Sequence, residues 1–302
     1  MRLPFHTLDV FTETRFAGNP LAVVLDAAEL APEAMQRVAR EFNLSETVFV
    51  LPAADPANTA KLRIFTPMRE LPFAGHPTVG TAALLAKIAA AEGKKPPRQS
   101  LRLEETVGLI RAEVGLGAGE AIQAEFEAPK LPERAGTPPA AELIAAALSL
   151  APADIGFAGH RVSCYSAGNP FVFVPVASLD AVRRVQAQLQ HWDAAFAGVA
   201  AAPYIYCRET DLPGSTFHAR MLAPRFGIVE DPATGSAAAA FAAVVAAFDR
   251  PADGSHRILI EQGFEMGRAS MIGLTVTMAA GRLTKVRIGG QTVPVSEGMI
   301  TV

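Results

Sequence analysis

The stretch AGNPLAVV at residues 17–24 recurs as AGNPFVFV at residues 167–174. A second pair follows in the same order, because GHPTVGTAA at residues 75–83 is matched by EDPATGSAA at residues 230–238. The Asn-Pro of the first motif lies 57 positions before the His-Pro of the second in one copy, and 62 positions before the Asp-Pro in the other. Two motifs in one order at nearly one separation indicate a duplicated structural unit.

A proline-rich segment between residues 127 and 153 separates the two copies, with five prolines around a short Ala-rich stretch. Nothing in it resembles a long flexible linker, so we expect the copies to pack against each other directly. The predicted domains are an N-terminal half at residues 1–128, which a C-terminal strand at about residues 291–302 can rejoin, and a C-terminal half at residues 129–290.

The secondary structure is also expected to repeat. Runs rich in β-branched and aromatic residues at 47–50, 62–65 and 202–208 predict strands. Residues 78–91 and 233–248 are rich in Ala, Leu and Val with almost no charge, and a helix that is apolar all round is a buried helix. These patterns predict an α+β fold of two similar strand-rich units, each wrapped around one buried helix.

Composition excludes several classes of partner. The 302 residues are 50% hydrophobic and 19% charged, which is typical of a folded globular protein, and the net charge is −3. The densest basic cluster, Lys94-Lys95 with Arg98 nearby, predicts a solvated loop and not a nucleic-acid surface. No stretch reaches the roughly 18 to 20 apolar residues of a membrane span. We therefore expect neither nucleic acid nor membrane as a partner.

Cysteine and histidine usage indicates a chain without metal or cofactor. Cys164 and Cys207 are too few for a disulfide framework or for a zinc site of their own. The histidines lack metal-ligand spacing, and no cofactor fingerprint is present. The N-terminal residues MRLPFH are polar where a signal peptide carries its apolar run, so a cytoplasmic location is expected.

The start of each predicted buried helix is a candidate site. Pro77 and Pro232 suit the first helical position, which makes His76 and Asp231 the predicted N-caps. Helix N-termini present unpaired N–H groups, and two such termini facing each other across the repeat would hold a carboxylate. Ordinary capping also explains Asp231. It explains His76 poorly, and an imidazole usually titrates near neutral pH.

Glu46 is the candidate acid or base. It stands between a helix end and a hydrophobic strand, where contact with Leu44, Val48 and Phe49 would remove water from its carboxylate. Spacing alone favours a solvent-facing glutamate, because the chain has 30 acidic residues.

Four motifs in order resemble those of the PhzF family, which is named for phenazine biosynthesis and is similar in fold to diaminopimelate epimerase. They are NLSET at residues 43–47, LPFAGHPT at 71–78, EDPATGSAA at 230–238, and EQG at 261–263 with MGR at 266–268. The opening and closing segments match as well, so the resemblance covers nearly the whole chain.

The resemblance implies two pseudo-equivalent halves, each a curled, mostly antiparallel sheet wrapped around a buried central helix. It also implies a cofactor-independent isomerase that shifts a proton on a small carboxylate, such as a cyclic amino or hydroxy acid, in a homodimer. In the biosynthetic member a glutamate that matches Glu46 moves a proton between carbons of trans-2,3-dihydro-3-hydroxyanthranilate. The residues implied in substrate binding are Ser45, Gly75, His76, Asp231, Gly235, Ser236 and Asn19.

Two other functions stay open on the sequence. One is a cofactor-independent amino-acid racemase or epimerase that uses Glu46 and a second base. The other is a small-molecule binding protein that has lost turnover. The related epimerase family uses two cysteines. The resemblance disfavours that mechanism here, because neither Cys164 nor Cys207 falls at the corresponding helix starts.

Overall fold

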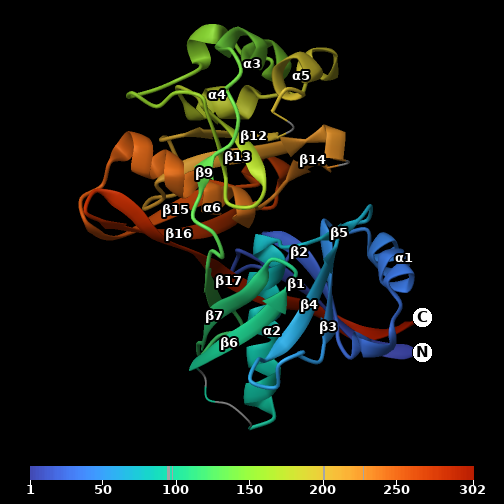
Figure 1. Ribbon diagram of the computed structural model, residues 1–302. Helices are drawn as coiled ribbons and strands as arrows, with labels where there is room; N and C mark the ends of the chain where they lie inside the picture. Colours follow the sequence, from blue (N-terminus) through green and yellow to red (C-terminus); the bar gives the residue numbers. More distant parts are fainter. Residues whose placement is uncertain (94–95, 97, 200, 227) are drawn as a thin grey trace. The chain divides into compact units, whose positions relative to one another are not determined.

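The computed structural model describes residues 1–93, 96, 98–199, 201–226 and 228–302. Lys94 and Lys95 of the basic cluster lie outside the described residues. The chain divides into two compact units (Figure 1). Unit 1 consists of Met1–Pro129 and Ile288–Val302, and unit 2 of Lys130–Arg287.

Eight strands of unit 1 form a closed ring. Their order around it is β1, β2, β3, β4, β6, β7, β8 and β17, and β17 pairs with both β8 and β1. The β2–β3 and β4–β6 pairs are parallel, and the other pairs with a described register are antiparallel. The bounds are β1 Arg2–Val10, β2 Asn19–Val24, β3 Glu46–Leu51, β4 Ala60–Phe65, β6 Arg98–Glu105, β7 Gly108–Leu116, β8 Ile122–Glu127 and β17 Arg282–Thr301.

The ring encloses the helix α2 (Gly75–Ala91), as Figure 1 shows. Every residue from Gly75 to Leu84 is buried, and the helix contacts β1, β2, β3, β6, β7 and β8. A Cβ added at Gly80 would lie 2.6 Å from Leu21 and 2.7 Å from Val10, so the missing side chain lets the helix approach the strands. The helix α1 (Pro32–Phe42) packs on β3 and β4, after the short η1 (Ala27–Glu29).

The strands of unit 2 also pair in a mixed arrangement. They pair in the order β9, β10, β11, β12, β13, β15 and β16, and β14 pairs with the end of β13, at Met221 to Ala223. The β11–β12 and β13–β15 pairs are parallel. The bounds are β9 Glu133–Arg134, β10 Ser163–Ser166, β11 Pro170–Pro175, β12 Ala202–Cys207, β13 Phe217–Ala223, β14 Ile228–Asp231, β15 Gly254–Gln262 and β16 Ser270–Ala279.

The buried helix of unit 2 is α6 (Gly235–Val244), which continues into the π-turn η4 (Val245–Asp249). All its residues except Ser236 are buried, and it contacts β10, β11 and β16. A separate apolar cluster around Trp192 is built by α3 (Ala141–Leu148), α4 (Leu179–Arg184) and α5 (Leu189–Phe196). The remaining short elements are β5 (Glu70–Leu71), η2 (Pro152–Asp154), η3 (Pro224–Phe226) and η5 (Phe264–Met266).

The predicted α+β class, with mixed sheets and helices, is confirmed, and so are buried helices at the two Ala-rich segments. None of the helices in the described part of the chain is long and apolar enough to cross a bilayer.

The predicted helix starts are wrong. The N-caps are Ala74 and Thr234, not His76 and Asp231. Pro77 is the third residue of its helix, where the N–H has no partner within the helix in any case, whereas Pro232 precedes its helix. Proline is tolerated at all these positions. It therefore indicates that a helix begins nearby but does not determine the first residue of that helix.

This shift also changes how the repeat aligns. β5 ends at Leu71, four residues before α2 begins, and β14 ends at Asp231, four residues before α6 begins. His76 is therefore the counterpart of Ser236, since each is the second residue of its helix.

The closure of β17 on β8 generates a prediction about stability. A Cβ added at Gly289 would lie 2.5 Å from the Ala124 carbonyl oxygen and 2.7 Å from the Cα of Glu125, which are backbone atoms that cannot rotate away. We expect Gly289→Ala to lower the free energy of unfolding by about 1–3 kcal/mol, measured as a lower urea midpoint.

Gly115→Ala is the matched control in β7, because a Cβ there meets nothing within 4 Å. Its urea midpoint should stay within error of the parent. Equal midpoints for Gly289→Ala and the parent would contradict the close approach of β17 and β8.

Candidate active site

Glu46 and His76 lie together in unit 1. Helix α1 ends at Asn43, which adopts the left-handed conformation with φ 51°, and the chain then enters β3 at Glu46. The parallel register sets Glu46 beside Leu21 of β2. His76, in the first turn of α2, places its Nε2 3.5 Å from Glu46 Oε2. The Glu46 side chain is 13% exposed and the His76 side chain 4% exposed, so little water reaches the contact.

The imidazole of His76 is held neutral. Burial lowers its pKa to about 3, against the opposing effect of a hydrogen bond to the Pro20 carbonyl. Since Nε2 has no hydrogen-bond partner among the described residues, Nδ1–H is the donor to Pro20. The lone pair of Nε2 therefore faces Glu46. The expectation of an imidazole that titrates near neutral pH is wrong, because the burial of the first turns of α2 also buries this ring.

The first AGNP motif positions this histidine. Asn19 is fully buried and opens β2, where it pairs with Val10 of β1. Gly18 before it has φ +67°, and an added Cβ would lie 2.4 Å from the Val10 carbonyl oxygen, so only glycine fits. The motif thereby fixes the Pro20 carbonyl that accepts from His76. Sequence reasoning missed Pro20, since a backbone carbonyl leaves no signal in residue type.

A second buried carboxyl group lies beside the first turns of α2. Thr78 Oγ1 is 2.7 Å from Glu105 Oε1 and 2.8 Å from the Ala74 carbonyl oxygen. Burial raises the pKa of Glu105 to about 8, although the hydrogen bond from Thr78 acts in the opposite direction. Glu105 therefore carries a proton at neutral pH. The sequence analysis did not single out this residue.

Two further predicted site residues of unit 1, Ser45 and Gly75, are the sequence neighbours of Glu46 and His76. Ser45 is partly exposed and directly precedes Glu46. Gly75 is the first residue of α2, and the first N–H groups of a helix have no partner within it. They can therefore donate to an anion.

Asp231 of unit 2 belongs to a buried polar network. Its Oδ2 accepts a hydrogen bond of 2.6 Å from the hydroxyl of Thr234, the N-cap of α6. The side-chain amide of Gln262 donates to the Asp231 carbonyl and to Thr234 Oγ1, and it accepts from the Thr234 N–H. The network fixes the segment that leads from β14 into α6.

Tyr204 lies beside this network. Burial, and after it the negative charge of Asp231, raise the pKa of the Tyr204 hydroxyl. Its oxygen has no hydrogen-bond partner within the described part of the chain.

Gly235 and Ser236 are the first two residues of α6, in the same places as Gly75 and His76 in α2. The sequence analysis missed Thr234 and Gln262. Gln262 belongs to the quoted EQG motif, but its partners are 28 and 31 positions away and come together only through the pairing of the sheet.

One cluster in unit 2 has the composition of a metal site. Ligand atoms of Asp211, His218 and Glu261 lie within 4.8 Å of one another. The two ring nitrogens of His218 are, however, 2.9 and 3.0 Å from carboxylate oxygens of Glu261 and Glu265. Burial alone would lower the pKa of His218, but these two carboxylates raise it to about 9. An imidazolium has no lone pair to offer, so the cluster is an ion-pair network.

The sequence and the fold both resemble those of known proteins. The sequence model of the PhzC-PhzF family, described as phenazine biosynthesis-like protein, matches residues 8–298. An uncharacterized isomerase of Mesorhizobium japonicum is 50% identical over 296 residues, which is 97% of this chain and 96% of that protein. The trans-2,3-dihydro-3-hydroxyanthranilate isomerase of Pseudomonas fluorescens is 36% identical over 297 residues, 97% of both chains.

A solved structure agrees with these relatives. The crystal structure of a PhzF-family phenazine biosynthesis protein from Bacillus anthracis matches with a TM-score of 0.88 at 26% identity and covers 100% of both chains. The family match thus extends over almost the entire sequence, and the protein belongs to the phenazine biosynthesis-like (PhzC-PhzF) family and is an isomerase.

Proposed function

We propose that this isomerase moves a proton between two carbons of a small carboxylated substrate without a cofactor, and that Glu46 is the acid and base. The observation that carries the proposal is the contact of 3.5 Å between Glu46 Oε2 and a neutral His76 Nε2. The Pseudomonas fluorescens relative is named for a cyclic carboxylate with amino and hydroxyl groups, which supports this substrate class.

The proton shift needs only one carboxylate. Glu46 takes a proton from one carbon, the electron pair left behind moves the neighbouring double bond, and Glu46 returns the proton to the far carbon. No electrons enter or leave, so the step needs no oxidant. His76 supports the protonated state of Glu46, because its Nε2 lone pair can accept from the carboxyl while Nδ1–H holds the ring in place.

The substrate carboxylate and polar groups need donors. We assign the N–H groups of Gly75 and Gly235, each the first residue of its helix, to the carboxylate. Ser236, His76, Ser45, Asn19 and Asp231 are assigned to polar groups of the substrate. This assignment treats the two units as pseudo-equivalent halves, which the repeated strand-to-helix segments at β5–α2 and β14–α6 support.

The family resemblance further favours a homodimer in the cytoplasm. The predicted boundaries at residues 1–128 and 129–290, with the strand at about residues 291–302 rejoining the first half, form part of the same proposal. Light scattering would test the dimer directly.

Glu46→Gln tests the assignment of the acid and base. The variant keeps the shape of the side chain but cannot shuttle a proton, so exchange of a carbon-bound proton should slow by ~10² to 10⁴. The measurement is proton NMR in deuterated water with trans-2,3-dihydro-3-hydroxyanthranilate or with a carboxylate selected by thermal shift. Glu41→Gln, on the exposed side of α1, is the control and should exchange at the parent rate.

Exchange by Glu46→Gln at the parent rate would remove Glu46 from the mechanism. The same experiment separates the alternatives. Loss of optical rotation without a new ultraviolet band would indicate a racemase. Tight binding by calorimetry without deuterium in the ligand would indicate a binding protein.

The neutrality of His76 predicts a pH dependence. Its folded-state pKa of about 3 lies below the usual 6.5, so the unfolded chain takes up a proton first as the pH falls. The stability due to this ring is therefore fully present above pH 6.5 and is lost between about pH 6.5 and 3. Nitrogen-15 NMR of labelled histidine should show a neutral ring protonated on Nδ1 at pH 5.

His76→Asn provides the matched thermodynamic test, because asparagine does not titrate. The difference in unfolding free energy between parent and variant should shrink as the pH is lowered from 7 to 4. A His76 resonance that titrates with a midpoint near 6.5 would contradict the structure.

A further inference from the structure

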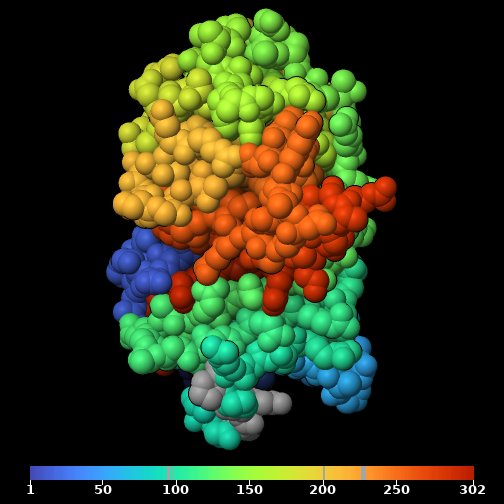
Figure 2. Space-filling model, turned by 90° about the vertical axis from the view of Figure 1, so that its left-hand side faces the viewer, coloured from blue at the N-terminus to red at the C-terminus, as the bar shows by residue number. Residues whose placement is uncertain are grey.

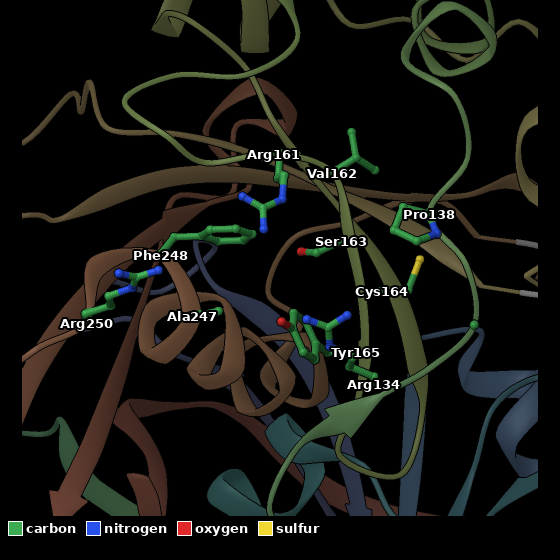
Figure 3. A pocket seen from close by; sticks show the side chains of 11 residues that line it. Arg134, Pro138, Arg161, Val162, Ser163, Cys164, Tyr165, Ala247, Phe248 and Arg250 are labelled. Carbon is green, nitrogen blue, oxygen red and sulfur yellow. The ribbon is translucent and has the colours of Figure 1, made fainter. Parts of the chain in front are cut away.

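A cavity of about 270 Å³ lies within unit 2, and none of the residues assigned to the proposed active site lines it. Its walls come from β9, from β10 with the segment before it, and from the η4 turn with Arg250 after it (Figure 3). In the space-filling view, the orange surface of the segment around residue 250 lies directly against yellow-green surface on the exposed face of the unit (Figure 2).

Positive charge gathers around this cavity. Arg134, Arg161 and Arg250 line it, and no acidic residue is among the described residues of its wall. Asp249, next to Arg250, directs its carboxylate to His160 and Arg208 instead. Exposed arginines with no carboxylate nearby repel one another, so three at one cavity favour a bound anion.

These three arginines also differ from others in the same unit. None of them forms an ion pair within the part of the chain that the structure describes. Five further arginines of unit 2 each pair with an aspartate or glutamate side chain: Arg183, Arg184, Arg208, Arg220 and Arg225. The cavity thus collects arginines that have no carboxylate partner among the described residues.

Arg161 contacts an aromatic ring. Its guanidinium lies over the ring of Phe248, 5.1 Å from the centroid. Stacking on an aromatic face leaves the N–H groups at the edge of the guanidinium free to donate, and a planar fork of donors matches the oxygens of a carboxylate or phosphate.

A buried hydroxyl points into the same space. Ser163 is 8% exposed, and its Oγ has no hydrogen-bond partner among the described residues. Figure 3 shows this hydroxyl directed toward the space that Arg134 and Arg161 also face. A buried hydroxyl without a partner is costly, so the site is built to receive a polar group.

We propose that this cavity binds a small metabolite through an oxyanion, a phosphate or carboxylate group held by Arg134, Arg161 and the Ser163 hydroxyl, with Arg250 at the rim. The volume exceeds that of a lone anion, since a water molecule occupies about 30 Å³. The rest of the ligand lies against Phe248 and Tyr165, which supply apolar wall. The inference does not depend on the proposed isomerase chemistry, because the two sites share no residue.

Calorimetry on the full chain at low ionic strength tests the site. The probes are inorganic phosphate, succinate and 3-phosphoglycerate, with sodium chloride at matched ionic strength as the blank. At least one probe should bind with one site per chain. Arg161→Gln should weaken that binding roughly tenfold or more, because it removes a charged hydrogen-bond donor, and Ser163→Ala should weaken it by a smaller factor.

Arg225→Gln is the matched control, since Arg225 is an exposed arginine of the same unit that pairs with Asp193. It should leave the affinity unchanged, and all variants should keep the parent melting temperature. Preference for phosphate-bearing probes or for succinate identifies the group that is held. Absence of binding by all three probes, or equal weakening by Arg225→Gln and Arg161→Gln, would overturn the proposal.

Discussion

A helix without a polar face has to be surrounded, and this constraint organises unit 1. Residues Gly75 to Leu84 of α2 are buried on every side, so no open sheet could cover them. The ring that does so closes only because β17 pairs with both β8 and β1. Gly80 lies where α2 approaches β1 and β2, and Gly289 lies where β17 approaches β8. Neither place has room for a side chain.

The chemistry of the candidate site follows from the same enclosure. His76 occupies the first turn of an enclosed helix, so its ring is stripped of water and remains neutral. A neutral ring can accept a hydrogen bond from Glu46, whereas an imidazolium would instead hold Glu46 as a fixed anion. In unit 2 the corresponding helix start carries Ser236. The buried polar side chains there are those of Asp231, at the end of β14, and Gln262, at the end of β15.

The sequence was sufficient to predict both buried helices, because a long uncharged run of Ala, Leu and Val forms a helix that is apolar on all faces, and such a helix is buried. It was not sufficient to set the helix starts, since proline is tolerated both inside the first turn and before it. The contact between Glu46 and His76 joins residues 30 positions apart and depends on the parallel register of β2 and β3. The Pro20 carbonyl and the Gln262 amide depend on backbone placement and sheet pairing, which no local pattern records.

The passage of β17 from one unit into the other has a consequence for biosynthesis. Unit 2 is continuous in sequence, but the ring of unit 1 needs residues 288–302, which leave the ribosome after all of Lys130–Arg287. At translation rates of about 5–20 residues per second, the first 129 residues wait on the order of 10 to 30 s with the edges of β1 and β8 unpaired. The half that is synthesised first is therefore the last to complete its fold. In that interval the strands cover the apolar surface of α2 only in part, unless a chaperone covers the rest.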